Sequence, residues 1–222
     1  ECRNLLTKKN KCVSGKIIQK FPLVMEVQGS TWSDYLKINL QGIGKHFALN
    51  ALSAIAVTDN LKIPHKKILK SLENFLPIDG RGAIYPFRRG VFFVDDTYNA
   101  NPDSMLAAIE ALSELQAIKC MVLADMGELG EKSSHSHTEV LKKASQKLEK
   151  VFLIGKDFAE ASQRLGVGFY CVDNYLLVNE INNWINAQVE SHPETEIAVW
   201  FKGSRLSGLE KVVKTLLKKG LN

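Results

Sequence analysis

The sequence predicts an α/β protein whose larger part is a mostly parallel sheet covered by helices, preceded by a smaller unit of strands and helices. Two observations indicate the larger part: from residue 91 onward short apolar runs recur, and an amphipathic stretch of helical length follows each of them. A third observation indicates the smaller part. Before residue 41 apolar and polar residues alternate with the period of two that is typical of half-buried strands.

In the first part, the alternating segments are 13–28 and 35–40, with a predicted turn at Gln28-Gly29-Ser30 between them. The Ala- and Leu-rich stretch 47–58 favours a helix. A second, shorter helix is expected over 64–75, where Pro64 suits a first helical turn.

Charge and composition change near residue 78. Residues 1–78 hold 12 Lys and Arg against 5 Asp and Glu, whereas 79–222 hold 17 against 19. Pro77, Gly80 and Gly82 interrupt regular structure at the same place. We therefore predict two domains, 1–78 and 79–222.

The second part alternates strand and helix. Strands are expected at 91–95, 120–124, 151–154, 169–172 and 197–201, and helices at about 103–115, 136–149, 157–164, 175–188 and 207–219. Such alternation implies right-handed crossovers and helices on both faces of the sheet, which is a Rossmann-like architecture. No G-x-G-x-x-G turn is present, so the fold alone does not predict a dinucleotide.

Composition excludes several classes of protein. Hydrophobic residues make up 45% of the chain and charged residues 24%, and no apolar run approaches the roughly 18 residues that span a bilayer. Basic residues are not interleaved with aromatics as in nucleic-acid-binding proteins, so no nucleic-acid partner and no membrane insertion are predicted. The four cysteines form no C-x-x-C pair and no metal-ligand spacing, which predicts a reducing compartment, no structural zinc and no metal site.

Polar residues follow three of the predicted strands. They occupy 95–102, 125–130 and 202–205, and because parallel strands end at one sheet edge, these loops should meet there. Each loop also has a structural reading: Asn101 before Pro102 is a good helix start, and the glycines can turn the chain. The adjacent carboxylates Asp95 and Asp96 are harder to explain structurally, because they repel one another unless donors or a ligand offset their charge.

The residues at these places resemble the Mur ligase family. The resemblance rests on five ordered blocks: Gly44-x-His46-x-x-x-Asn50-Ala51-Leu52, Gly80-Arg81, Asp95-Asp96-Thr97-Tyr98-Asn99-Ala100-Asn101-Pro102, Asp125-Met126-x-Glu128-Leu129-Gly130 and Lys202-Gly203-Ser204-Arg205. It runs from about residue 13 to the C-terminus. Within the family, the last three blocks are most similar to the branch that joins D-alanyl-D-alanine to UDP-N-acetylmuramoyl-tripeptide.

The resemblance implies a cytoplasmic ATP-dependent peptide ligase of peptidoglycan synthesis that forms an acyl phosphate with the help of Mg²⁺. By position, the ATP-binding residues would be His46, Asn50, Arg81, Asp96 and Tyr98, with Arg81 also catalytic at the γ-phosphate. The residues expected to hold D-alanyl-D-alanine are Asn99, Asn101, Asp125, Lys202, Ser204 and Arg205. The resemblance implies that 1–78 is the end of the central ATP-binding domain, that 79–222 is the C-terminal domain, and that the protein is a monomer.

Two departures from the family accompany the match. Phe47 stands where the family usually has Asn, and no G-x-x-x-x-G-K-[ST] phosphate loop occurs. The chain does not begin with Met, and we expect it to be the end of a longer polypeptide whose upstream part holds most of the ATP and Mg²⁺ site. The 222-residue chain should then be inactive alone, and ligation by it would contradict this expectation.

Two alternatives stay open. A folylpolyglutamate-type ligase shares the two-domain core, although its C-terminal domain is not expected to carry the Y-N-A-N-P and K-G-S-R blocks. A non-catalytic Rossmann-like binding module is the alternative outside enzymes. The polar residues at three strand ends argue against it, because a scaffold has no need of them.

Overall fold

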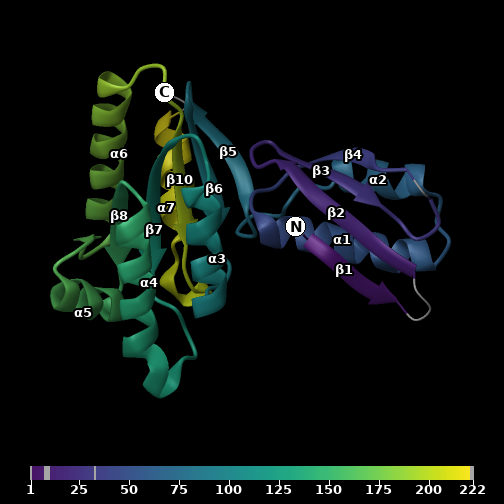
Figure 1. Cartoon of the computed structure of the whole chain (residues 1–222). Coiled ribbons are helices and arrows are strands. Elements are labelled where there is room, and N and C mark those ends of the chain that lie inside the picture. The colour runs from purple at the N-terminus through teal and green to yellow at the C-terminus, as the bar shows by residue number, and fades with distance from the viewer. Residues whose placement is uncertain (1, 8–10, 33, 221–222) are drawn as a thin grey trace. The chain divides into compact units, whose positions relative to one another are not determined.

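The computed structural model in Figure 1 describes residues 2–7, 11–32 and 34–220, and it divides into two compact units, Glu1–Pro77 and Ile78–Asn222. Within the described residues, no helix has the length and apolar character needed to cross a membrane.

The first unit is a four-stranded antiparallel sheet with two helices. Its strands are β1 (Cys2–Thr7), β2 (Lys11–Gln19), β3 (Leu23–Gln28) and β4 (Leu36–Leu40), hydrogen-bonded in that order. The helices are α1 (Lys45–Asn60) and α2 (His65–Glu73). Alternate residues of β3 are buried, among them Leu23, Met25 and Val27, and they pack with Leu52 and Ile55 of α1. The period of two in the sequence therefore marks the face of the sheet that α1 covers.

Asp59 joins the end of α1 to the turn after β3. Its carboxylate accepts hydrogen bonds from the Ser30 backbone N–H (2.6 Å), the Ser30 hydroxyl (2.5 Å) and the Thr31 hydroxyl. Burial alone would raise the pKa of Asp59, but these hydrogen bonds outweigh it and hold the pKa below its ordinary value.

Asp59→Asn is expected to destabilise the first unit by about 2 kcal/mol at pH 7, because the hydrogen bonds to a charged acceptor are lost. A carboxyl group whose pKa is depressed by folding contributes stability above its unfolded pKa of about 3.9, and loses it as the pH falls through the folded pKa. The difference between variant and parent should therefore shrink below about pH 4. Hydrogen exchange of the α1 amides at several pH values measures it, with the exposed Asp34→Asn as control; equal effects of the two variants would contradict the prediction.

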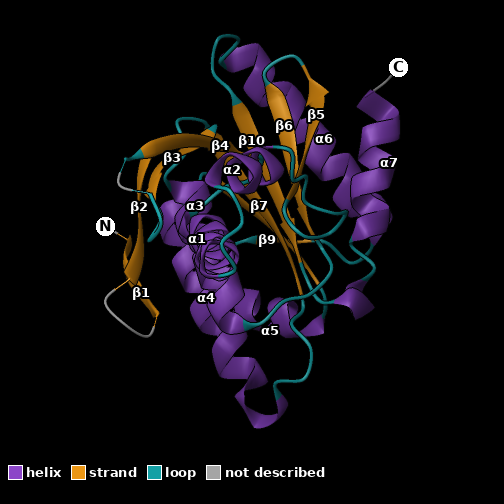
Figure 2. Cartoon of the chain, turned by 90° about the vertical axis from the view of Figure 1, so that its right-hand side faces the viewer, coloured by secondary structure: helices purple, strands orange, loops and turns teal. Residues whose placement is uncertain are grey.

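The second unit is a six-stranded sheet with helices on both faces (Figure 2). Its strands are β5 (Ala83–Arg88), β6 (Val91–Asp96), β7 (Ile118–Ala124), β8 (Lys150–Ile154), β9 (Phe169–Tyr170) and β10 (Ile197–Lys202). The order across the sheet is β5-β6-β10-β7-β8-β9. All neighbours are parallel except β5, which pairs with β6 antiparallel. The prediction of a mostly parallel Rossmann-like sheet is confirmed.

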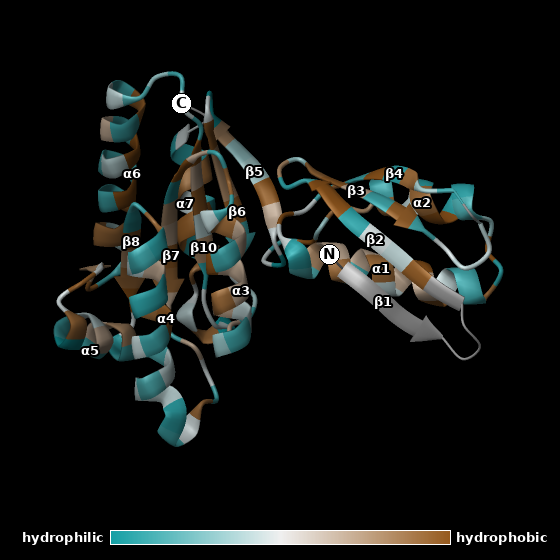
Figure 3. Ribbon diagram, in the orientation of Figure 1, coloured by the Kyte–Doolittle hydropathy of each residue, from teal (hydrophilic) through white to brown (hydrophobic). Residues whose placement is uncertain are grey.

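The helices of the second unit are α3 (Pro102–Ser113), α4 (Ser133–Lys147), α5 (Lys156–Leu165), α6 (Asn174–Ser191) and α7 (Glu210–Gly220), with short 3₁₀ turns at Gly130–Lys132 and Arg205–Ser207. Helices α6 and α7 cover one face, where Phe93, Val199 and Phe201 form a core with Ile181 and Val213. Helices α3 and α4 lie against the strands on the other side (Figure 2). Because both faces are covered, β10 is buried along its whole length, and β7 and β10 are mostly brown in the hydropathy colouring of Figure 3.

Two strands were not predicted. Strand β5 contains Pro86, which in the sequence suggests a break in regular structure. Proline is tolerated here because β5 is an edge strand, and the pairing with β6 shifts register between Pro86 and Arg88. Strand β1 lies in a stretch of mixed polarity that shows no clear alternation.

Cys120 and Cys171 are fully buried free thiols. Burial raises the pKa of both, and that of Cys171 reaches about 11. Such thiols pack as small hydrophobic groups and are poor nucleophiles at neutral pH.

Candidate functional site

The three polar loops predicted from the sequence follow adjacent strands of the second sheet. Strand β10 lies between β6 and β7, and Lys202 is in register with Asp96 on one side and Leu123 on the other. Since these strands are parallel, the loops beginning at Thr97, Asp125 and Gly203 leave the sheet at the same edge. The sheet therefore brings together residues that are more than a hundred positions apart in the sequence.

Lys202 and Asp96 form an ion pair at the centre of this edge. The Lys202 ammonium donates to Asp96 Oδ2 at 2.7 Å and to the Asn99 carbonyl at 3.1 Å. Its side chain is only 4% exposed, compared with 19% for Asp96. Lys202 thus links the ends of β6 and β10 and fixes the loop that follows β6.

Asp95 holds the neighbouring Gly80 loop. Its Oδ2 accepts from the Gly80 N–H at 3.1 Å, and its Oδ1 accepts from the Thr97 hydroxyl at 2.6 Å and from the Thr97 N–H at 3.3 Å. The repulsion expected between Asp95 and Asp96 is therefore offset by donors within the chain, different ones for each carboxylate.

Arg81, Tyr98 and Arg205 meet at the surface of the same edge. The Arg81 guanidinium carbon lies 3.9 Å from the centroid of the Tyr98 ring, and that of Arg205 lies 5.4 Å from it. All three side chains are exposed. The structure thus brings together two arginines that the sequence assigned to different ligands.

Asn99 and Asn101 make local hydrogen bonds. Asn99 Oδ1 accepts from the Ala100 N–H at 2.9 Å. Asn101 is the N-cap of α3: its Oδ1 accepts from the Ser104 N–H at 2.8 Å, and the Ser104 hydroxyl accepts from the Asn101 N–H at 3.1 Å. Pro102 lies in the first turn of α3. The sequence therefore correctly predicted that Asn101 and Pro102 form a good helix start.

Asn101→Ala is expected to lower the free energy of unfolding of the second unit by about 1 kcal/mol, because the Ser104 N–H loses its acceptor. Asn101→Ser keeps a capping oxygen and should lower the free energy of unfolding by only about 0.3 kcal/mol. Urea denaturation of the two variants measures the difference, and equal losses would show that capping is not the role of this side chain.

Asp125 caps a helix that begins thirty residues later. Its carboxylate accepts from the Asp157 and Phe158 N–H groups of α5, at 3.1 and 3.0 Å. Gly155, the N-cap of α5, has φ +109°, and a Cβ there would lie 2.3 Å from Asp125 Cγ. The Asp125 carbonyl also accepts from the Ser204 N–H at 3.1 Å. Asp125 therefore holds both α5 and the loop after β10.

His137 supports the loop that begins at Asp125. Its Nε2 accepts from the Met126 N–H at 2.9 Å, and its Nδ1 lies 2.8 Å from the Ser133 carbonyl. These partners require the neutral imidazole protonated at Nδ1. His137 is fully buried, whereas His135, two residues earlier, is exposed. In the loop itself, Glu128 has φ +61°, a conformation that is strained for any residue with a Cβ.

His46 and Asn50 belong to the first unit, where both are exposed in the first turns of α1. Phe47 packs on Gly42 and lies 6.4 Å from Phe75 between ring centroids, so the residue that departs from the family pattern has a packing role.

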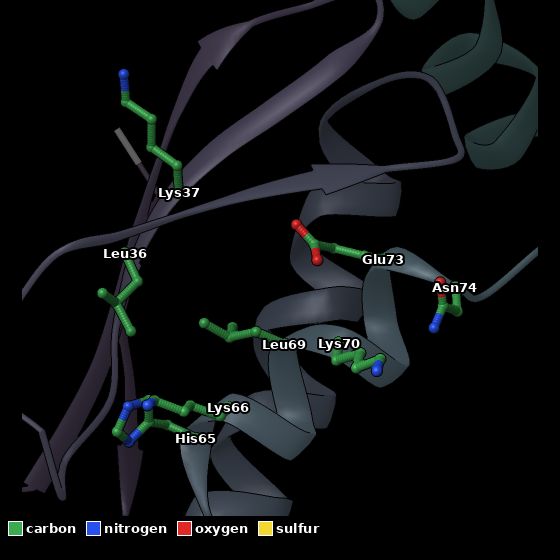
Figure 4. Close-up of a pocket in the computed structure, with 8 residues that line it drawn as sticks. All are labelled: Leu36, Lys37, His65, Lys66, Leu69, Lys70, Glu73 and Asn74. Carbon is green, nitrogen blue, oxygen red and sulfur yellow. The ribbon is translucent and has the colours of Figure 1, made fainter.

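A groove of about 520 Å³ lies between β4 and α2 in the first unit (Figure 4). It is lined by Leu36, Lys37, His65, Lys66, Leu69, Lys70, Glu73 and Asn74. None of these is a predicted site residue, so the groove does not coincide with the polar loops.

Three residues that contribute to the site were given no role in it from the sequence. Thr97 and Gly80 complete the hydrogen bonds of Asp95, and Gly155 makes room for Asp125. Gly80 stands in the Gly80-Arg81 block, but nothing in the sequence indicates that its N–H binds Asp95. No pattern in the sequence links Gly155 to a carboxylate thirty residues away.

The comparisons with known proteins agree with this architecture. Residues 80–205 match the family model for the Mur ligase glutamate ligase domain. The UDP-N-acetylmuramoyl-tripeptide–D-alanyl-D-alanine ligase of Escherichia coli is 31% identical over 178 residues, which are 80% of this chain and 38% of that protein. The Bacillus subtilis protein of the same name is 30% identical over 183 residues, 81% of this chain and 40% of that protein. The chain thus spans about two fifths of the length of these relatives.

Among solved structures, MurF from Acinetobacter baumannii is similar with a TM-score of 0.76 and 26% identity, over 93% of this chain and 45% of that one. A Mycobacterium tuberculosis folylpolyglutamate synthase has a TM-score of 0.67 at 14% identity, over 91% of this chain and 48% of that one, and at this identity the likeness shows the fold alone. The matched family model covers more than half of the chain and all three polar loops. The chain belongs to the Mur ligase family.

Proposed function

We propose that the chain serves in an ATP-dependent amide ligase that joins D-alanyl-D-alanine to UDP-N-acetylmuramoyl-tripeptide in peptidoglycan precursor synthesis. The observation that carries the proposal is the convergence of the three polar loops at one sheet edge, in a chain about 30% identical to ligases of that name. On this proposal, 1–78 is the end of an ATP-binding domain and 79–222 is the C-terminal domain. The protein works in the cytoplasm as a monomer.

The reaction has two steps. The tripeptide carboxylate attacks the γ-phosphorus of ATP, which gives an acyl phosphate and ADP. The amine of D-alanyl-D-alanine then attacks the acyl carbon, loses a proton and expels phosphate, which leaves an amide bond. Phosphoryl transfer depends mainly on positioning and on stabilising negative charge. Arg81 suits the second task, because its exposed guanidinium offers a planar set of donors to phosphoryl oxygens.

The other predicted residues divide into two groups. We assign adenine binding to Asn50 with His46 supporting that helix start, ribose binding to Asp96, and nucleotide contact to Tyr98. Asn99 is exposed and can reach a dipeptide directly, and the resemblance also gives the exposed Arg205 to the dipeptide. Asn101, Asp125 and Lys202 hold the loops through their side chains, and Ser204 does so through its backbone N–H.

Mg²⁺ is implied by the use of ATP, and its role would be to screen phosphate charge. The described residues do not form a site for it: they contain no group of three His, Cys, Asp or Glu side chains placed to hold a metal. The neighbouring carboxylates Asp95 and Asp96 are hydrogen-bonded to Gly80, Thr97 and Lys202. We therefore assign no step of the reaction to a metal held by this chain.

Phosphate release by the product of the complete reading frame tests the function. ATP, UDP-N-acetylmuramoyl-tripeptide and D-alanyl-D-alanine are omitted in turn, and release should require all three. Arg81→Ala should lower the rate at least about tenfold, since a transition-state contact to phosphate is lost. The exposed Arg89→Ala, which removes an equal charge from the same unit, should leave it unchanged.

The other outcomes are informative. Release with glutamate in place of the dipeptide would assign the protein to a sister ligase. No release under any combination would favour the non-catalytic binding module.

A further inference from the structure

Two arginines from opposite ends of the second unit share one aromatic ring. Arg81 precedes β5 and Arg205 follows β10, yet their guanidinium carbons lie 3.9 and 5.4 Å from the centroid of the Tyr98 ring. The two guanidinium groups are therefore no farther apart than the sum of these distances. A phosphate group has several oxygens, so it can accept hydrogen bonds from two guanidinium groups at once.

The backbone beneath the three residues is fixed. Gly80 donates to Asp95 Oδ2 at 3.1 Å, and its carbonyl accepts from the Tyr98 N–H at 3.0 Å, which ties the Arg81 loop to the Tyr98 loop. Gly80 has φ +77°, and a Cβ there would lie 3.1 Å from Tyr98 Cβ, so the two loops touch. On the other side, the Ser204 N–H donates to the Asp125 carbonyl at 3.1 Å, immediately before Arg205.

The two guanidinium groups have no carboxylate partner among the side chains that the structure describes. Arg88 and Arg164 of the same unit do have polar partners, since Arg88 donates to Asn186 at 2.7 Å and Arg164 donates to Ser134 and Thr138 at 3.0 Å. Among the described residues the exposed Arg89 has no such partner, but unlike Arg81 and Arg205 it does not lie over the Tyr98 ring. Two like charges held near one another are unfavourable. The electron-rich face of Tyr98 offsets part of this cost, and an anion bound between them would offset the rest.

We propose that Arg81 and Arg205 together bind one phosphoryl dianion, and that Tyr98 is a positioning residue that holds both guanidinium groups for it. A phosphate or diphosphate group suits the pair better than a carboxylate does, because it offers more oxygens to two planar donor sets and carries more than one negative charge. That this anion is the transferred phosphoryl group of a ligase rests on the proposed function; binding of the anion itself does not.

This assignment changes the role expected of Arg205. The resemblance gave Arg205 to the dipeptide and Arg81 to phosphate. The common ring instead places both on the same ligand, so loss of Arg205 should weaken phosphate binding as loss of Arg81 does.

Calorimetric titration of inorganic pyrophosphate into the 222-residue chain at low salt tests the proposal. One equivalent should bind, and Arg81→Ala and Arg205→Ala should each weaken this single event about tenfold or more. Arg89→Ala is the matched control and should change the affinity less than about twofold, since it acts only through long-range charge. The proposal would be overturned if the chain bound two equivalents and each variant abolished a different one. It would also be overturned if Arg205→Ala bound pyrophosphate as tightly as Arg89→Ala does.

Two substitutions of Tyr98 test its part. Tyr98→Phe keeps the aromatic face and should retain the affinity within about twofold, whereas Tyr98→Leu should weaken binding about fivefold or more, because a cation–π contact is lost from both arginines. Circular dichroism establishes that each variant is folded. If the Phe and Leu variants bind pyrophosphate with equal affinity, Tyr98 does not position the two arginines. If phosphate release fails while this pattern holds, the ligase assignment is wrong and the two-arginine site stands.

Discussion

Asp96→Asn is expected to lower the free energy of unfolding of the second unit by roughly 3–5 kcal/mol. The substitution leaves the Lys202 ammonium, whose side chain is 4% exposed, without its counter-charge at the end of the central strand. A buried charge that loses its partner keeps the cost of desolvation and loses the attraction that offset it.

Lys202→Met should cost less, about 2 kcal/mol, because the Asp96 side chain is 19% exposed and water can solvate it. The double variant should be more stable than Asp96→Asn alone, since no unpaired buried charge remains. Urea denaturation followed by tryptophan fluorescence measures this in a Trp32→Phe background, which leaves Trp184 and Trp200 to report on the second unit.

The control is Asp103→Asn, an exposed carboxylate in the first turn of α3, which should cost no more than about 1 kcal/mol. If the double variant loses as much as the two single variants together, the coupling between Asp96 and Lys202 is absent. The prediction also affects kinetic experiments: a loss of activity in an Asp96 variant does not by itself identify a ribose ligand, because the same side chain holds the loop that carries Tyr98.

Gly155→Ala is expected to destabilise the second unit by roughly 3 kcal/mol, for two reasons that add. The residue has φ +109°, which alanine adopts only with strain, and its Cβ would lie 2.3 to 2.5 Å from the Asp125 carboxylate atoms. That carboxylate cannot move aside cheaply, because it accepts the hydrogen bonds of two α5 amides.

Gly166→Ala is the matched control at the other end of α5. Gly166 also has a positive φ, +67°, but nothing lies within 4 Å of the position of its Cβ, so only the backbone strain of about 1 kcal/mol is expected. Thermal unfolding of the two variants compares them. Equal losses would mean that the Asp125 carboxylate accommodates the methyl group, and that the cap of α5 is not rigid.

The elements of the fold could be predicted wherever the signal is local. The strands of the second unit are apolar runs in the sequence because helices bury both faces of the sheet. The start of α3 is predictable because Asn101 is a favourable N-cap and Pro102 a favourable first helical residue. Strand β5 could not be read in this way, because Pro86 obscures it and its place at the sheet edge is a property of the topology.

The candidate site was predictable in its location but not in its internal pairing. Parallel strands deliver polar loops to one edge, so Asp96, Asp125 and Lys202 could be placed there from the sequence. Their partners could not. Lys202 and Asp96 are 106 residues apart, so no local pattern links them. Asp125 binds backbone N–H groups of α5, and the sequence does not show which backbone groups a carboxylate will bind. A charged residue reserved for a ligand and one reserved for an internal ion pair look the same before the chain is folded.

The position of β10 in the sheet has a consequence for synthesis of the chain. This strand is the last in the sequence, yet it is inserted between β6 and β7, which pair with it on either side. Until Ile197–Lys202 have left the ribosome, β6 and β7 each present an unpaired, strongly apolar edge to the surroundings. The pairings of β10 with β6 and β7 can therefore form only late in synthesis, and until then these two edges are open to pairing with the edges of other chains.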